Sequence, residues 1–235
     1  MTFHKKQEDY IAKIEEAFRN LREANIPERG VITQVLMPNE NQHDARNPNY
    51  SRTYPVLDIT LDSNGIKGDR HYATYTREVG RNAGLLPRGV EFSGNRHMMA
   101  ISDYDCKVLS DRLGKKITPE QLGTNLVISR EDGQDYSLSA LPQEAYLVIA
   151  PEDSETLPIE PIAVLVRHGM QKGCKVTGLC VSKEHGDKSL INRFKAESTT
   201  NRGLVLRAIY PTPNKPALIK PGQKVYFLYS DGISE

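Results

Sequence analysis

Cysteine is scarce and tryptophan is absent from this sequence, which has three cysteines among 235 residues. So few and so widely spaced thiols do not form a disulfide framework of the kind that stabilises small secreted domains. The first ten residues, MTFHKKQEDY, have no apolar core and do not resemble a secretory signal. We therefore expect a cytoplasmic protein whose thiols are reduced.

Long apolar runs and an excess of one charge are also missing. No run approaches the roughly 18 apolar residues of a membrane-spanning helix, so no membrane association is expected. The formal net charge is +1, which gives no global attraction to nucleic acid. Any anion must therefore bind through a local group of basic residues, such as a small-molecule site.

The pattern of apolar residues predicts a mainly β domain with a few helices. Residues 5–25 have helical periodicity and predict an N-terminal helical arm over 1–28, packed on the domain or on a second subunit. Residues 29–230 contain eight runs rich in Val, Ile, Leu or Tyr, which favour an antiparallel or mixed β-barrel. These runs are 31–37, 56–61, 97–102, 125–129, 145–150, 162–168, 203–210 and 224–229. Helices are predicted over 102–114, 118–123 and 188–198, the first between an N-cap at Ser102 and a terminating Gly114.

Two of the three cysteines lie in the segment GMQKGCKVTGLCVSKEHGD. Cys174 stands between Lys172 and Lys175 in a Gly-rich stretch, and nearby cations favour the reactive thiolate. Cys180 is a rival nucleophile or a resolving partner for Cys174. Cys106 falls on a predicted helix and fits a buried apolar role instead.

Histidines within and beside the same segment could act with its cysteines. The gaps between Cys174, Cys180 and the histidines His168 and His185 are too long for a structural zinc site, so no structural zinc is expected. A Cys–His nucleophile pair remains open, with three candidate histidines that the sequence does not rank. These are His71, His97 and His168.

The segment Asn64-Gly-Ile-Lys-Gly-Asp-Arg-His71 follows a predicted strand. Its glycines allow a tight turn against a ligand, and Lys67 and Arg70 offer cationic donors for a phosphate or carboxylate. The alternative is a structural turn in which Asp69 pairs with Arg70. The long segment 76–96 carries four arginines and is either a solvated loop or a loop that closes over an anion.

Several segments, taken in order, resemble the MOSC domain, the module named after the C-terminal part of molybdenum cofactor sulfurases, and especially its small stand-alone bacterial members. The matching segments run from about residue 30 to 228. They are Gly65-Ile-Lys-Gly-Asp-Arg-His71, Pro87-Arg-Gly89 leading to Asn95-Arg96, Leu122-Gly-Thr-Asn-Leu-Val127, Cys174 with Gly178, Arg202-Gly-Leu-Val205 and Ile219-Lys-Pro-Gly-Gln-Lys-Val225. Gly173 stands where the family usually has Pro, and Leu179 where it commonly has Arg.

The resemblance implies a β-barrel of the MOSC type, similar to the pyruvate-kinase barrel, and a molybdenum- or sulfur-related function. Cys174 would carry a persulfide sulfur or ligate the molybdenum of a pterin cofactor, and Cys180 is the second catalytic candidate. The expected cofactor-binding residues are Lys67, Asp69, Arg70, His71, Arg96, Asn125 and Arg202. Pyridoxal phosphate binding is a further expected property.

Three functions follow as hypotheses. The first two are a persulfide sulfur carrier and a molybdenum-dependent reductase of N-hydroxylated compounds, each with a sulfur donor or electron-transfer protein as a possible partner and with a possible homodimer. The third, from another class, is a non-catalytic binding module that retains the barrel. Because Arg70, Arg96 and Arg202 fall at predicted strand ends, we expect them to converge near Cys174, where their mutual repulsion would favour a bound anion.

Overall fold

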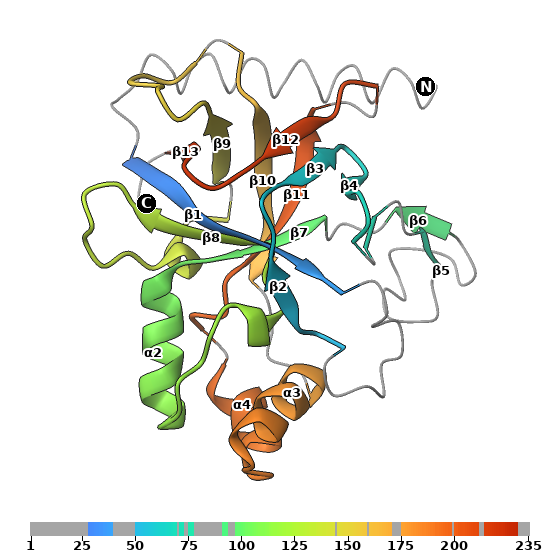
Figure 1. Ribbon diagram of the computed structural model, residues 1–235, viewed down its shortest axis with the longest axis vertical. Coiled ribbons are helices and arrows are strands. Elements are labelled where there is room, and N and C mark those ends of the chain that lie inside the picture. Colours follow the sequence, from blue (N-terminus) through green and yellow to red (C-terminus); the bar gives the residue numbers. More distant parts are fainter. Residues whose placement is uncertain are drawn as a thin grey trace, which may run out of the picture.

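Seven strands close into a β-barrel in the computed structural model (Figure 1). Strand β1 (Glu28–Pro38) pairs with β8 (Leu126–Arg130) on one side and β13 (Lys224–Leu228) on the other, which closes the circle. The remaining strands, from β13 round to β8, are β9 (Tyr146–Ala150), β10 (Ala163–Met170), β11 (Leu204–Tyr210) and β7 (Met98–Ile101). Every barrel pairing is antiparallel except that of β7 with β8. The predicted mainly β barrel is confirmed.

The structure describes residues 28–39, 50–69, 71–72, 75–77, 91–93, 97–143, 145–158, 160–170, 175–198, 200–211 and 214–229. The predicted N-terminal arm lies outside these residues except for its last position.

Short strands extend the barrel. β2 (Thr53–Pro55) pairs with the last residues of β1. β12 (Ala217–Ile219), β3 (Ile59–Asp62) and β4 (Gly65–Ile66) form a separate three-stranded sheet, and β5 (Tyr75–Arg77) pairs with β6 (Glu91–Ser93). Of the predicted run 56–61, only residues 59–61 lie in a strand, β3. The other five short strands were not predicted, because strands this short carry too little periodicity to detect.

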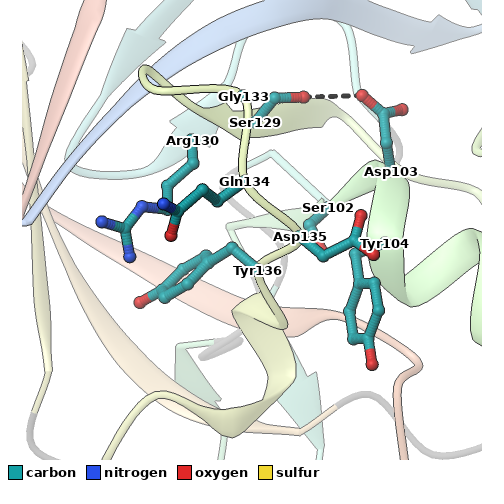
Figure 2. Close-up of a pocket in the computed structure, with 9 residues that line it drawn as sticks. All are labelled: Ser102, Asp103, Tyr104, Ser129, Arg130, Gly133, Gln134, Asp135 and Tyr136. Atoms are coloured by element: carbon teal, nitrogen blue, oxygen red, sulfur yellow. Dashed lines mark hydrogen bonds between the residues drawn. The ribbon is translucent and has the colours of Figure 1, made fainter.

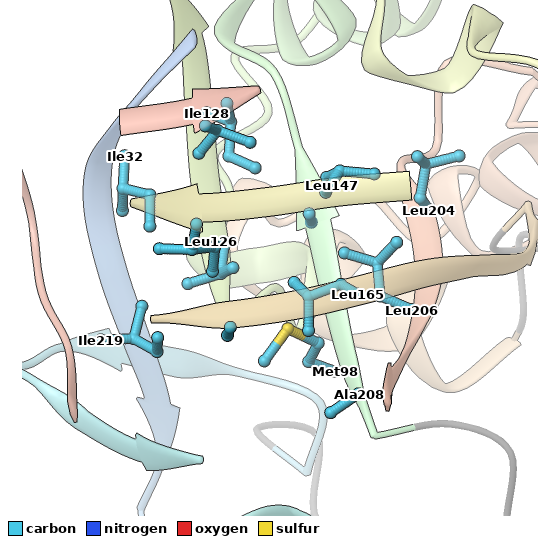
Figure 3. Packing of buried hydrophobic residues seen from close by; sticks show 14 of the residues in the cluster. Ile32, Met98, Leu126, Ile128, Leu147, Leu165, Leu204, Leu206, Ala208 and Ile219 are labelled. Atoms are coloured by element: carbon cyan, nitrogen blue, oxygen red, sulfur yellow. The ribbon is translucent and has the colours of Figure 1, made fainter. Parts of the chain in front are cut away.

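The barrel interior is filled by alternating apolar side chains (Figure 3). On β11, Leu204, Leu206 and Ala208 belong to the buried core, whereas the residues between them are only partly buried. This is the period-two pattern of a strand with one buried face. Burial of a Leu or Ile side chain stabilises the fold by roughly 1.5–3 kcal/mol.

Three α-helices in the described part of the chain pack at one side of the barrel (Figure 1). They are α2 (Asp103–Leu113), α3 (Lys175–His185) and α4 (Leu190–Glu197), together with the short helices η1 (Glu120–Leu122) and η2 (Leu138–Ala140). The predicted caps of α2 are confirmed, because Ser102 Oγ accepts from Asp105 N at 3.1 Å and Gly114 is left-handed at φ 63°. No helix among these is long and apolar enough to cross a membrane.

Helix α3 was not predicted: its glycine and lysine content indicated a turn. Tertiary packing stabilises it instead. A side chain at Gly178 would approach the backbone oxygen of Ile191 on α4 to 2.7 Å, so the two helices touch where α3 has no side chain. Gly178, part of the MOSC-like pattern, is thus a packing residue in this fold.

We predict that Gly203→Ala destabilises the fold by roughly 2 kcal/mol or more in urea unfolding. Gly203 has a φ of +85°, and a Cβ there would collide with the carbonyl oxygen of Ala100 in β7. Gly169→Ala is the control, because its Cβ would meet no atom within 4 Å. Equal stability of the two variants would contradict the prediction.

Candidate functional site

The turn that follows β3 is held by two buried or half-buried carboxylates. Asp62 accepts from the Asn64 N–H at 2.7 Å and from the Tyr72 hydroxyl at 2.9 Å. The second bond, made to a carboxylate, raises the pKa of Tyr72. Asp69 accepts from the His71 N–H at 2.8 Å. The predicted tight turn is therefore rigid at both ends.

Asn125 connects this turn to the barrel. Its Nδ2 donates to Asp69 Oδ2 at 3.1 Å and to the carbonyl of Leu36 at 3.4 Å, while its Oδ1 accepts from Met99 N at 2.9 Å. The side chain is 4% exposed. The described hydrogen bonds of Asn125 and Asp69 therefore hold β1, β7 and the turn together. Both residues were predicted to bind cofactor.

Arg202 is a fully buried arginine behind the site, at 0% exposure. Its Nη2 donates to the carbonyl of Leu122 at 3.0 Å and to Thr177 Oγ1 at 3.2 Å, and its guanidinium carbon lies 5.2 Å from the centre of the Phe194 ring. The contact with Thr177 places a positive charge against the first turn of α3. Because Asn125 follows Leu122 by three residues, the segment between them links Arg202 to the turn at Asp69.

A buried polar network fixes the backbone on either side of Arg202. Asn201 is left-handed at φ 53° and donates to Asp105 Oδ1 at 2.8 Å. Ser139 connects Asp105 to Gly203, the residue after Arg202. The Ser139 N–H donates to Asp105 Oδ2 at 3.1 Å, and its Oγ accepts from Gly203 N at 2.9 Å. The spacing of Ser102 and Asp105 indicated only a helix cap, so this wider role of Asp105 was missed.

Two of the three cysteines are buried. Cys106 is 6% and Cys180 is 2% exposed. Burial is the largest cause that raises the pKa of each thiol, and at Cys180 it outweighs the lowering effect of the nearby Arg52. Burial therefore disfavours the reactive thiolate form of both residues. Cys174 lies outside the described residues and is followed in the sequence by Lys175, the first residue of α3.

The idea that Cys180 resolves Cys174 stays a prediction, because Cys174 lies outside the described residues. Cys180 itself is a buried residue of α3.

The other candidates differ in exposure. Lys67 is exposed and His71 is partly buried, whereas Arg70 and Arg96 lie outside the described residues. His97 is buried, and its Nδ1 accepts from the N–H of Ala208 at 3.1 Å. His168 is exposed, and both partial burial and the charge of Arg207 lower its pKa. Within the described residues no group of three or more His, Cys, Asp or Glu could hold a metal ion.

A separate pocket lies between the start of α2 and the loop after β8 (Figure 2). Its volume is about 140 Å³. Ser129 Oγ donates to Asp103 Oδ2 across it at 2.6 Å, and Asp135 adds a second acid. The Arg130 guanidinium is already paired with Asp132 at 2.8 Å. This acidic lining does not suit the phosphate of a cofactor, and nothing in the sequence marked these loop residues.

The sequence matches no family model and no curated protein. Three solved structures that align with the chain are as follows. The YuaD protein of Bacillus subtilis superposes with a TM-score of 0.64 at 18% identity, over 86% of this chain and 97% of that chain. The YiiM proteins of Geobacillus stearothermophilus and Escherichia coli both have a TM-score of 0.47, at 11% and 9% identity, over 87% and 86% of this chain and 77% and 71% of theirs. At 18% identity, the likeness to YuaD is one of fold.

We predict that Asn125→Ala lowers the free energy of unfolding by about 2–4 kcal/mol, because it leaves Met99 N and Asp69 Oδ2 without this partner. Urea unfolding followed by circular dichroism measures the loss. Asn192→Ala, at an exposed position on α4, serves as the control. A loss below about 0.5 kcal/mol, the usual range of surface substitutions, would show that Asn125 does not brace the turn.

We also predict that Cys174 alkylates first when the native protein is treated with substoichiometric iodoacetamide near pH 8. The thiolate forms of Cys106 and Cys180 are disfavoured because burial raises the pKa of each thiol. Peptide mapping identifies the labelled residue. Comparable labelling of Cys106 would remove the distinction between these thiols.

Proposed function

We propose that this protein performs thiolate chemistry at Cys174, as a carrier of sulfane sulfur or as a thiolate ligand of a molybdenum-pterin cofactor. The observation that carries the proposal is the burial of both Cys106 and Cys180, whose thiols have raised pKa values. The MOSC resemblance, together with the barrel fold that it implies, supports the same residue. Sulfur transfer and molybdenum ligation both require a soft, deprotonated sulfur.

The start of α3 offers an environment that favours a thiolate. Because Cys174 directly precedes Lys175, the positive end of the helix dipole acts on this part of the chain. The guanidinium of Arg202, bonded to Thr177 in the first turn, adds a full positive charge to the same helix end. Both effects lower a thiol pKa.

In the carrier version, the Cys174 thiolate attacks the outer sulfur of a donor persulfide. A new S–S bond forms on Cys174, and the donor leaves as a thiolate. The sulfur can then pass to an acceptor nucleophile by the same exchange. No metal is required, and the donor is a partner protein or a small persulfide.

In the cofactor version, the residues present fit part of what a molybdenum-pterin cofactor would require. When bound, the cofactor would supply two-electron redox chemistry for the reduction of an N-hydroxylated compound. Cys174 would provide the thiolate, and the exposed Lys67 would balance the charge of the pterin phosphate. Asn125, Asp69 and Arg202 would position the surrounding backbone through the bonds that they already make.

The test is purification from a host that makes the molybdenum cofactor, followed by measurement of molybdenum and of cyanide-labile sulfur per chain. The redox version predicts that Cys174→Ser loses most of the bound molybdenum, and the carrier version predicts that it loses most of the cyanide-labile sulfur. Cys106→Ala is the matched control, because it removes a buried thiol and should keep the signal.

The outcomes separate the hypotheses. Molybdenum near one atom per chain that depends on Cys174 supports the redox version, and labile sulfur without molybdenum supports the carrier. If neither signal depends on Cys174, the proposal is wrong and the protein is better described as a binding module that retains the barrel.

A further inference from the structure

Arg167 occupies an interior position near the end of β10, where a charged residue is unexpected. Ala163 and Leu165 precede it at alternate positions and both belong to the barrel core. On the neighbouring strand Arg167 pairs with Leu206, another core residue. Its N–H donates to the carbonyl of Ala145 at 3.0 Å. By strand alternation the side chain continues the inward row.

The buried Nε of Arg167 has no hydrogen-bond acceptor among the residues that the structure describes. No acid in the described part of the chain forms an ion pair with it, and burial alone lowers its pKa. Since a buried N–H without an acceptor is costly, it indicates a site completed by a group that the described part of the chain does not supply.

Solvent reaches part of Arg167. The residue is only partly buried, although its Nε is buried. Ala145, beside it, carries only a methyl group. On the far side of Ala145, Tyr229 follows the pairing of Leu228 with Tyr146 and packs against the barrel core. The cationic Arg167, the small Ala145 and the aromatic Tyr229 are therefore neighbours across three adjacent segments of the barrel.

We propose that this end of the barrel binds the oxyanion group of a small molecule, a phosphate or a carboxylate, on the guanidinium of Arg167. Arginine binds both groups through paired N–H donors in a planar fork. The proposal does not depend on the thiol chemistry proposed for Cys174. The site differs from the predicted anion cluster, whose described arginine, Arg202, is fully buried.

Arg207 provides a matched control. It lies on β11 between the inward residues Leu206 and Ala208, so it points away from the interior. It pairs with Val166, the residue before Arg167. A Met substitution at either arginine removes one positive charge and keeps an unbranched apolar chain. The two variants therefore have equal net charge and differ in which face loses the cation.

The experiment measures the binding of inorganic phosphate by calorimetry and by thermal unfolding, with chloride at equal ionic strength as the reference. The unmodified protein should bind phosphate saturably, and Arg167→Met should weaken binding by about tenfold or more. Arg207→Met should bind within about twofold of the unmodified protein, since Arg207 faces away from the interior and makes no contact with an anion held there. Acetate then tests whether a carboxylate competes for the same site.

Three results would overturn the proposal. One is the absence of any phosphate effect beyond that of chloride, which would leave water as the partner of Arg167. Another is equal weakening by Arg167→Met and Arg207→Met, which would indicate general charge attraction. The third is a large loss of stability of Arg167→Met in phosphate-free buffer, because removal of an unpaired buried N–H should leave stability unchanged or raised. Cys174→Ser should keep phosphate binding, so failure at Cys174 and failure here are distinguishable.

Discussion

The closure of the barrel by β1 is the constraint on which the rest of the structure depends. This strand supplies hydrogen bonds to β8 along one edge and to β13 along the other, so the barrel strands have no open seam there. Gly30 lies where the three strands meet, and a Cβ there would approach both Ile128 and Phe227 to 3.0 Å. The strands can be this close only because the position is a glycine. Closure of the barrel fixes which face of each strand points to the interior, so the loop that follows each strand starts at a defined position.

The polar residues that the sequence marks as binding residues divide into two physical kinds. Asn125, Asp69 and Arg202 are buried or half-buried, and their described bonds go to the protein's own backbone and side chains. Lys67 is exposed and available to a ligand, and Arg167 lacks an acceptor for its buried Nε. A pattern of polar residues alone does not separate these kinds. A residue that holds the backbone in place and a residue that binds a ligand both need a hydrogen-bonding side chain at a fixed position.

How much the sequence predicted follows from the range of the interactions involved. Local signals sufficed for α2, whose cap at Ser102 and stop at Gly114 are set by neighbouring residues. The long barrel strands carry enough alternation to be found. Helix α3 depends on packing against α4 at Gly178, a contact with Ile191 that no local pattern reveals. In the same way, the burial of Cys180 and the inward position of Arg167 follow from tertiary structure.

The parallel pairing of β7 with β8 has a consequence for how the molecule is connected. Parallel neighbours cannot be joined by a hairpin, so the chain from Ile101 to Leu126 must cross over outside the barrel. That crossover contains α2 and η1, and it ends in the segment that bonds to Arg202 and to Asp69. During synthesis the crossover is complete long before β13 emerges to complete the wall beside β1. Among the described strands β13 is the last in chain order, and its pairing with β1 and β9 turns an open sheet into a barrel.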